Sequence, residues 1–203
     1  LRGALSIVIL LIVIGMTGGL RHLGMSATPI VLVRSIFDAL GTIFFIAALV
    51  NMKIADLSAV VMTSPLILTA LAAFMLGDHV GWRRWLAIGV GLAGTLFIVK
   101  PGAGAFDMWA LAGLAAAFFG AARDLTTRRL DPATSSLAVG LCGTIAVTLS
   151  GAGIGLAETW VIPNREQWTL IAIAAMFLGL GTYLVVHAFR GVEIAAVAPF
   201  RYT

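Results

Sequence analysis

Several charged side chains stand inside apolar stretches of this 203-residue sequence, and charge in such surroundings needs a physical reason. Arg123 follows Met108 by 15 residues, a separation of about 22 Å along a helix. Arg201 lies eight residues into the last apolar segment, roughly 12 Å along a helix. Guanidinium groups bind carboxylates and phosphates well, so both arginines are candidate ligands for an anionic group of a small molecule.

Each of these arginines also has a purely structural interpretation. Arg123 could extend its charged end to the edge of the apolar layer, and Arg201 could pair with a counter-charge on another helix. Neighbouring helical residues point about 100° apart, so we expect Arg123 and Asp124 not to pair with each other. The helical neighbour of Asp124 at i+4 is Arg128.

A second acid and base stand one helical turn apart, at Arg34 and Asp38. Their i,i+4 spacing predicts an ion pair near the start of a helix. If Asp38 instead faces a polar path, burial would favour its neutral form and make it a candidate proton carrier. Both interpretations stay open at this point.

Two prolines interrupt apolar segments, Pro65 directly after Ser64 and Pro199 near the end of the chain. A proline within a helix removes one backbone hydrogen bond and frees a carbonyl group. A freed carbonyl is tolerated only where it faces protein or water. Pro65 and Pro199 are therefore candidate hinges, with tolerated kinks as the alternative, and Ser64 is a candidate substrate ligand.

A further set of polar residues lies on the apolar segment near residues 168–189. Thr182, Tyr183 and His187 could form a polar stripe that faces a substrate path. A single histidine within an apolar helix can equally hydrogen-bond to a neighbouring helix. Tyr183 and His187 are included among the candidate substrate ligands.

No arrangement of residues suggests an enzyme or a bound cofactor. The sequence has neither H-E-x-x-H nor a P-loop, and no serine stands at a plausible spacing from a histidine and an acid. Its single cysteine, Cys142, lies inside an apolar run and suggests packing. We therefore expect no catalytic activity, no cofactor and no metal site.

The composition explains why these charges are exceptional. Hydrophobic residues make up 61% of the chain and charged residues 11%, against about half and a quarter in soluble domains. Apolar runs of about 20 residues recur, the length that crosses a bilayer as a helix. We predict an all-α polytopic membrane bundle, with helices near residues 1–20, 30–50, 57–77, 83–100, 108–129, 135–157 and 168–189, and a stub from 194.

Basic residues are distributed unequally between alternate loops, which predicts the orientation of the chain. One side holds eight of them and the other holds three, so the first side should be cytoplasmic. The short loops leave no room for a soluble domain. Since most of the basic residues fall between apolar runs, they indicate contact with membrane lipids and not with nucleic acid. Along one segment, Gly140, Thr144 and Thr148 recur at four-residue spacing, which favours close helix packing.

A faint internal repeat relates the two parts of the chain. With a shift of 140 residues, the segment Gly41 to Thr63 matches Gly181 to Thr203 at six of 23 positions. This shift pairs helices that lie five apart, and an odd offset reverses the direction through the membrane. The pattern predicts an inverted repeat of five-helix units, which is a recurring plan of secondary transporters. The units would be residues 1–102 and 103–203, as parts of a longer ten-helix protein.

Residues 63–102, TSPLILTALAAFMLGDHVGWRRWLAIGVGLAGTLFIVKPG, resemble the end of an EamA-type domain of the drug/metabolite transporter superfamily. The opening LRGALS resembles the family's second helix, and ARDLTTRRL and VAPFRYT resemble its sixth and ninth helices. Asp78 and His79 replace the usual Glu-Arg, and Lys100 replaces the usual arginine before Pro101. By this resemblance Arg2 lies within the membrane, which makes it a candidate substrate ligand.

The resemblance implies a ten-helix carrier of the cell inner membrane, which moves a small polar metabolite by alternating access. An amino acid, a vitamin such as riboflavin, or a nucleotide-like compound such as S-adenosylmethionine fits this expectation. Without a P-loop, accumulation of the substrate must draw on ion or substrate gradients. A lipid-linked-sugar flippase of the same superfamily and a non-transporting membrane fragment are the alternatives.

Overall fold

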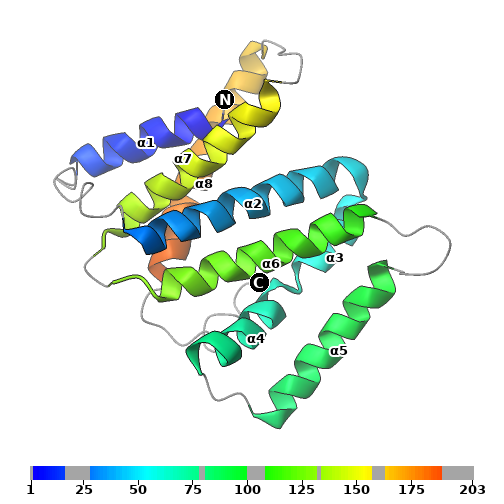
Figure 1. The fold of residues 1–203 in the computed structure, drawn as a ribbon. Coiled ribbons are helices and arrows are strands. Elements are labelled where there is room, and N and C mark those ends of the chain that lie inside the picture. The colour runs from blue at the N-terminus through cyan, green and yellow to red at the C-terminus, as the bar shows by residue number, and fades with distance from the viewer. Residues whose placement is uncertain are drawn as a thin grey trace. The chain divides into compact units, whose positions relative to one another are not determined.

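The regular structure in the described part of the chain is entirely helical (Figure 1). The computed structural model describes residues 2–16, 28–77, 81–99, 108–131, 134–156 and 163–188. Their helices are α1 (Arg2–Met16), α2 (Pro29–Asn51), α3 (Ile54–Val61), α4 (Ser64–Leu76), α5 (Trp82–Val99), α6 (Met108–Arg128), α7 (Ser136–Gly155) and α8 (Arg165–Ala188). The predicted all-α fold class is confirmed.

The predicted helix at residues 57–77 consists of two helices, α3 and α4, separated by Met62 and Thr63. Pro65 lies in the first turn of α4 and has no N–H to donate to the carbonyl of Val61. Just before it, the carbonyl of Val60 accepts both the Thr63 N–H at 3.1 Å and the Thr63 hydroxyl at 2.6 Å. The helix is thus interrupted beside Pro65, and the proposed role of this residue as a hinge remains a prediction.

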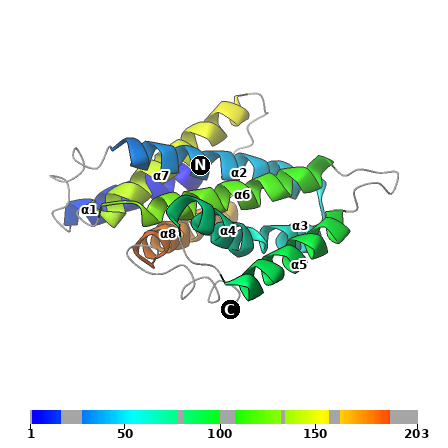
Figure 2. The same ribbon diagram turned by 60° about the horizontal axis from the view of Figure 1, so that its bottom comes forward.

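The chain divides into two compact units, and the first comprises residues 1–39 and 126–191. In this unit α1, α7 and α8 pack against one another, as the two views also show (Figures 1 and 2). The buried hydroxyl of Ser6 donates to the carbonyl of Ala175 at 3.0 Å and so joins α1 to α8. Leu10, Ile14 and Leu141 form an apolar cluster between α1 and α7.

The first residues of α2 belong to the same unit and pack on α7. Val31 of α2, Val139 of α7 and Leu130 form a second buried apolar cluster. Cys142 packs against this cluster, in agreement with the packing role expected for it. These apolar contacts fix the face that α2 turns toward α7.

The described residues of the second unit lie between residues 40 and 125. Here α5 packs against α3 and α4, and the buried pair Val60 and Ala110 joins α3 to α6. Phe44 of α2 stacks on Phe119 of α6, with ring centroids 5.6 Å apart and an interplanar angle of 10°. A Cβ built on Gly113 would lie only 3.2 Å from Leu57 Cδ1, so α6 approaches α3 where its side chain is smallest.

Four helical spans in the described residues are long and apolar enough to cross a membrane, by length and composition. They are Pro29–Asn51, Ile54–Leu76, Met108–Arg128 and Ser136–Gly155. The second of these combines α3 and α4. Residues 189–203 lie outside the described part, so the terminal stub, the inverted repeat and the division at residue 102 remain predictions.

Candidate functional site

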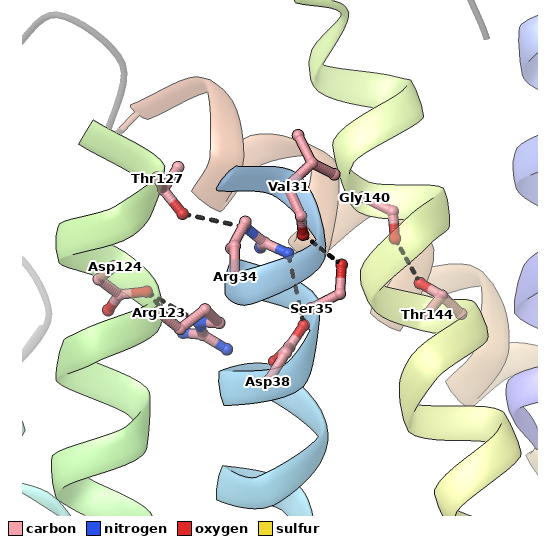
Figure 3. Close-up of polar contacts among 9 residues, drawn as sticks. All are labelled: Val31, Arg34, Ser35, Asp38, Arg123, Asp124, Thr127, Gly140 and Thr144. Carbon is pink, nitrogen blue, oxygen red and sulfur yellow. Dashed lines mark hydrogen bonds and ion pairs between the residues drawn. The ribbon is translucent and has the colours of Figure 1, made fainter. Parts of the chain in front are cut away.

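Arg34 is a buried cation in the first turns of α2, with only 1% of its surface exposed. Its Nε donates to the hydroxyl oxygen of Thr127 at 3.0 Å, and its Nη1 lies 3.6 Å from Asp38 Oδ2. Figure 3 shows Arg34 between these two partners. The ion pair expected from the i,i+4 spacing is therefore present, and it lies within the protein.

The Asp38 side chain is slightly more open than that of its partner, at 14% exposure against 2%. The surroundings of the pair are themselves polar, because Ser35 stands between the two residues on the same helix. The Ser35 hydroxyl donates to the carbonyl of Val31 at 2.8 Å, as the dashed line in Figure 3 marks. This half of α2 therefore carries a cation, an anion and a hydroxyl group within little more than one turn.

The expectation that Arg123 and Asp124 do not pair is wrong. In the second unit, Arg123 Nε donates to Asp124 Oδ1 at 2.9 Å, and Nη2 lies 2.8 Å from the same oxygen (Figure 3). The helical angle separates Cα–Cβ directions, but an arginine side chain is long enough to bend back around the helix. Asp124 is 1% exposed, and a buried carboxylate gains strongly from a partner.

Ser64, the first residue of α4, combines burial with an unsatisfied hydroxyl. It is 2% exposed, and its Oγ has no hydrogen-bond partner among the described residues. A Cβ built on Gly120 of α6 would lie 3.7 Å from this oxygen, so the hydroxyl faces the α6 backbone of its own unit. Buried hydroxyl groups are normally satisfied, and an exception calls for an explanation.

The other predicted site residues are placed as follows. Arg2 is exposed at the start of α1, and Pro65 is buried beside Ser64. The side chains of Tyr183 and His187 lie outside the described part, as do Pro199 and Arg201. Within the first unit the structure brings Asp38 together with Arg34, Thr127 and Gly143, three residues that the sequence did not assign to a site.

Arg34 and Gly143 differ in how well the sequence could have identified them. Arg34 carried a signal, as the partner of Asp38 at i,i+4. Gly143 carried little, because it is one of 23 glycines in the chain. Its neighbours Gly140 and Thr144 lie on a buried part of α7, where the Thr144 hydroxyl donates to the Gly140 carbonyl at 2.8 Å. Gly143 is distinguished from the other glycines only by the position of α7 relative to Arg34.

Comparison with known proteins identifies the first part of the chain. The model of the EamA-like transporter family matches residues 2–100. A riboflavin transporter of Rhizobium johnstonii is 27% identical over 169 residues, which cover 83% of this chain and 56% of that protein. An S-adenosylmethionine uptake transporter of Rickettsia bellii is 29% identical over 141 residues, or 68% of this chain and 47% of that protein.

A pseudopaline exporter of Pseudomonas aeruginosa is 24% identical over 181 residues, which cover 89% of this chain and 64% of that protein. The chain spans about half the length of the riboflavin and S-adenosylmethionine transporters that it matches. No solved structure matches it with comparable significance.

The family and the apolar helices together identify a multi-pass protein of the cell inner membrane. The family match also agrees with the resemblance of residues 63–102 to an EamA-type domain, because most of these residues lie inside the matched range. Residues 2–100 of the chain thus match the EamA-like transporter family, and the resemblance to EamA-type transporters expected from the sequence is confirmed.

Proposed function

We propose that the native full-length protein is a secondary transporter that moves a small polar metabolite across the inner membrane by alternating access. The observation that carries this proposal is the family match over residues 2–100, joined by relatives that are themselves named as transporters. Relatives named for uptake and relatives named for export both occur among the matches, so we leave the direction of transport open.

The chemistry inside the helices supports a transport role. Arg34 and Asp124 are almost fully buried in helices that are otherwise long and apolar. Ionisable groups inside membrane helices are costly, and they commonly mark paths for ions or substrates. A protein that served only as a scaffold could replace each pair by apolar residues of similar size at little cost.

The proposed substrate carries an anionic or strongly polar group. Arg123, Arg201 and Arg2 are the residues that we propose for carboxylate or phosphate groups. Ser64, Tyr183 and His187 are the proposed hydrogen-bonding ligands. Riboflavin and S-adenosylmethionine, which are named for the relatives, fit this class and are the first compounds to test.

Movement and energy coupling are assigned to a few further residues. Asp38, paired with Arg34, is the proposed proton carrier, because a carboxyl group that exchanges its partner for a proton crosses apolar surroundings at lower cost. Pro65 and Pro199 are the proposed hinges. Pro65 stands where α3 and α4 are separated, and a break between two rigid helices can absorb a change in backbone angles.

An uptake screen tests the proposed function. The full-length protein is reconstituted in lipid vesicles and offered labelled riboflavin, S-adenosylmethionine and amino acids, with and without a proton gradient. We expect at least one compound to enter well above the rate of protein-free vesicles. If the inserted protein moves none of these solutes but does move a lipid-linked sugar, it is a flippase and the proposal is wrong.

Replacement of Ser64 by alanine separates a substrate ligand from a packing residue. The Ser64 hydroxyl has no described partner, so its removal should change thermal stability little or raise it slightly. If Oγ binds the substrate, the half-saturating concentration in the uptake assay rises about fivefold, since one hydrogen bond contributes roughly 1 kcal/mol. Unchanged stability together with unchanged uptake would remove Ser64 from the site.

A further inference from the structure

Gly143 of α7 lies directly against the Arg34–Asp38 pair, in the same compact unit. A Cβ built on this glycine would lie 2.7 Å from Arg34 Nη1 and 2.8 Å from Asp38 Oδ2. Both distances are shorter than real Cβ atoms essentially ever show. Any other residue at position 143 must therefore displace one member of the pair or move α7 away from α2.

Neither side of this contact can yield easily. On one side, Arg34 Nε is held by the Thr127 hydroxyl at 3.0 Å, so the guanidinium cannot retreat without losing that bond. On the other side, Val31 and Val139 pack together in a buried cluster. They precede Arg34 and Gly143 by one helical turn and so lie on the same helix faces. This cluster holds α7 against α2 at the level of the pair.

We infer that Gly143 is a positioning residue, whose lack of a side chain lets the α7 backbone hold Arg34 Nη1 beside Asp38 Oδ2. This inference rests on the proposed function and deepens it, because the contact determines whether Asp38 stays paired. While α7 packs at Gly143, Arg34 is confined between Thr127, Asp38 and the α7 backbone. A movement of α7 away from α2 opens space beside both charges and allows them to separate.

The direct test is Gly143→Ala in the full-length protein, with Gly151→Ala as its matched control. Gly151 lies two turns further along α7, and a Cβ built on it meets no atom of the described residues within 4 Å. We expect Gly143→Ala to lower the maximal rate of uptake about tenfold, a typical size for an interaction between groups in contact. The half-saturating concentration should change less, because the residue does not bind the substrate, and Gly151→Ala should behave like the wild type.

A second substitution distinguishes positioning from simple overpacking of helices. Arg34→Lys removes Nη1, the atom nearest to the added methyl group, and keeps a cation that can reach Asp38. We expect the double variant Gly143→Ala/Arg34→Lys to transport faster than Gly143→Ala alone. If Gly143→Ala acts only by forcing helix backbones apart, the lysine brings no improvement and the inference is overturned.

The thermal unfolding midpoint of the purified protein gives a readout that does not depend on transport. Gly143→Ala should lower the midpoint by roughly 5 °C, and Arg34→Lys should restore part of the loss. If the wild type moves no solute but Arg34→Lys still restores part of the midpoint lost in Gly143→Ala, the proposed transport function is wrong and the inference about Gly143 is supported. If the effects of Gly143→Ala and Arg34→Lys on the unfolding midpoint simply add, the inference about Gly143 is wrong, whatever the protein transports.

Discussion

Arg34→Ala is expected to leave little stably folded protein. The substitution removes a cation that is 1% exposed, takes the ion-pair partner from Asp38 and takes a hydrogen-bond donor from Thr127. Loss of one member of a buried pair costs about 3–5 kcal/mol. Since proteins are stable by only about 5–15 kcal/mol, a large share of the stability is lost. The yield of monodisperse protein and its unfolding midpoint measure the effect.

Two further variants make this result interpretable. Arg84→Ala removes an exposed arginine of α5 and should change the unfolding midpoint little. The double variant Arg34→Met/Asp38→Leu replaces the pair by apolar side chains, so it should regain most of the stability. It should nevertheless transport poorly if the charges have a role in transport. Wild-type stability of Arg34→Ala would show that the charge is not buried in the membrane-inserted protein.

Asp124→Asn is expected to have the second-largest effect on stability. The amide keeps the shape of the side chain but removes the charge from an oxygen that lies 2.8 Å from Arg123 Nη2. The arginine side chain is 22% exposed, so it can extend part of its charge toward water. We therefore expect the free energy of unfolding to fall by about 3 kcal/mol, which is at the lower end of the range for a broken buried ion pair. Thermal unfolding of the variant and the wild type, both purified in one detergent, measures this loss.

Asp56→Asn is the matched control for this substitution, because Asp56 is an exposed acid in the first turn of α3 in the same unit. Asp56→Asn should lower the free energy of unfolding by about 0.5 kcal/mol, because the N-terminal end of the helix dipole favours a negative charge. The double variant Arg123→Gln/Asp124→Asn forms a neutral pair and should be more stable than Asp124→Asn. Equal stability of Asp124→Asn and the wild type would mean that the two charges do not depend on each other.

The approximate positions of the described helices followed from the sequence because apolar length is a strong signal. The predicted helix near 108–129 corresponds to α6 at Met108–Arg128, and the one near 30–50 corresponds to α2 at Pro29–Asn51. A run of this composition must satisfy its backbone internally, and a helix does so within one segment. The separation of α3 and α4 was marked in the sequence by Pro65.

The faces of the helices could not be predicted in the same way. Apolar residues surround a membrane helix on all sides, so periodicity does not distinguish the face that packs on protein from the face that meets lipid. Residues 140–144 illustrate this limit. The spacing of Gly140 and Thr144 predicted close packing, yet the glycine that contacts Arg34 and Asp38 is Gly143, which lies outside that spacing.

The pairing of Arg123 with Asp124 was missed for a related reason. The helical angle describes where side chains begin, and short side chains follow it well. An arginine reaches several ångströms from its Cα, so burial and the available partner decide where its guanidinium lies. The presence of charged groups in apolar surroundings is visible in the sequence. Their partners, however, can be assigned only from the three-dimensional structure.

Counterflow in proteoliposomes tests the central claim, transport by alternating access, most directly. Vesicles that contain the full-length protein are loaded with an excess of an unlabelled solute identified by the uptake screen and then diluted into a trace of the same solute in labelled form. A carrier whose site faces one side at a time exchanges the two, so we predict that labelled solute transiently accumulates above its external concentration. If it only equilibrates, without such an overshoot, the protein does not work by alternating access.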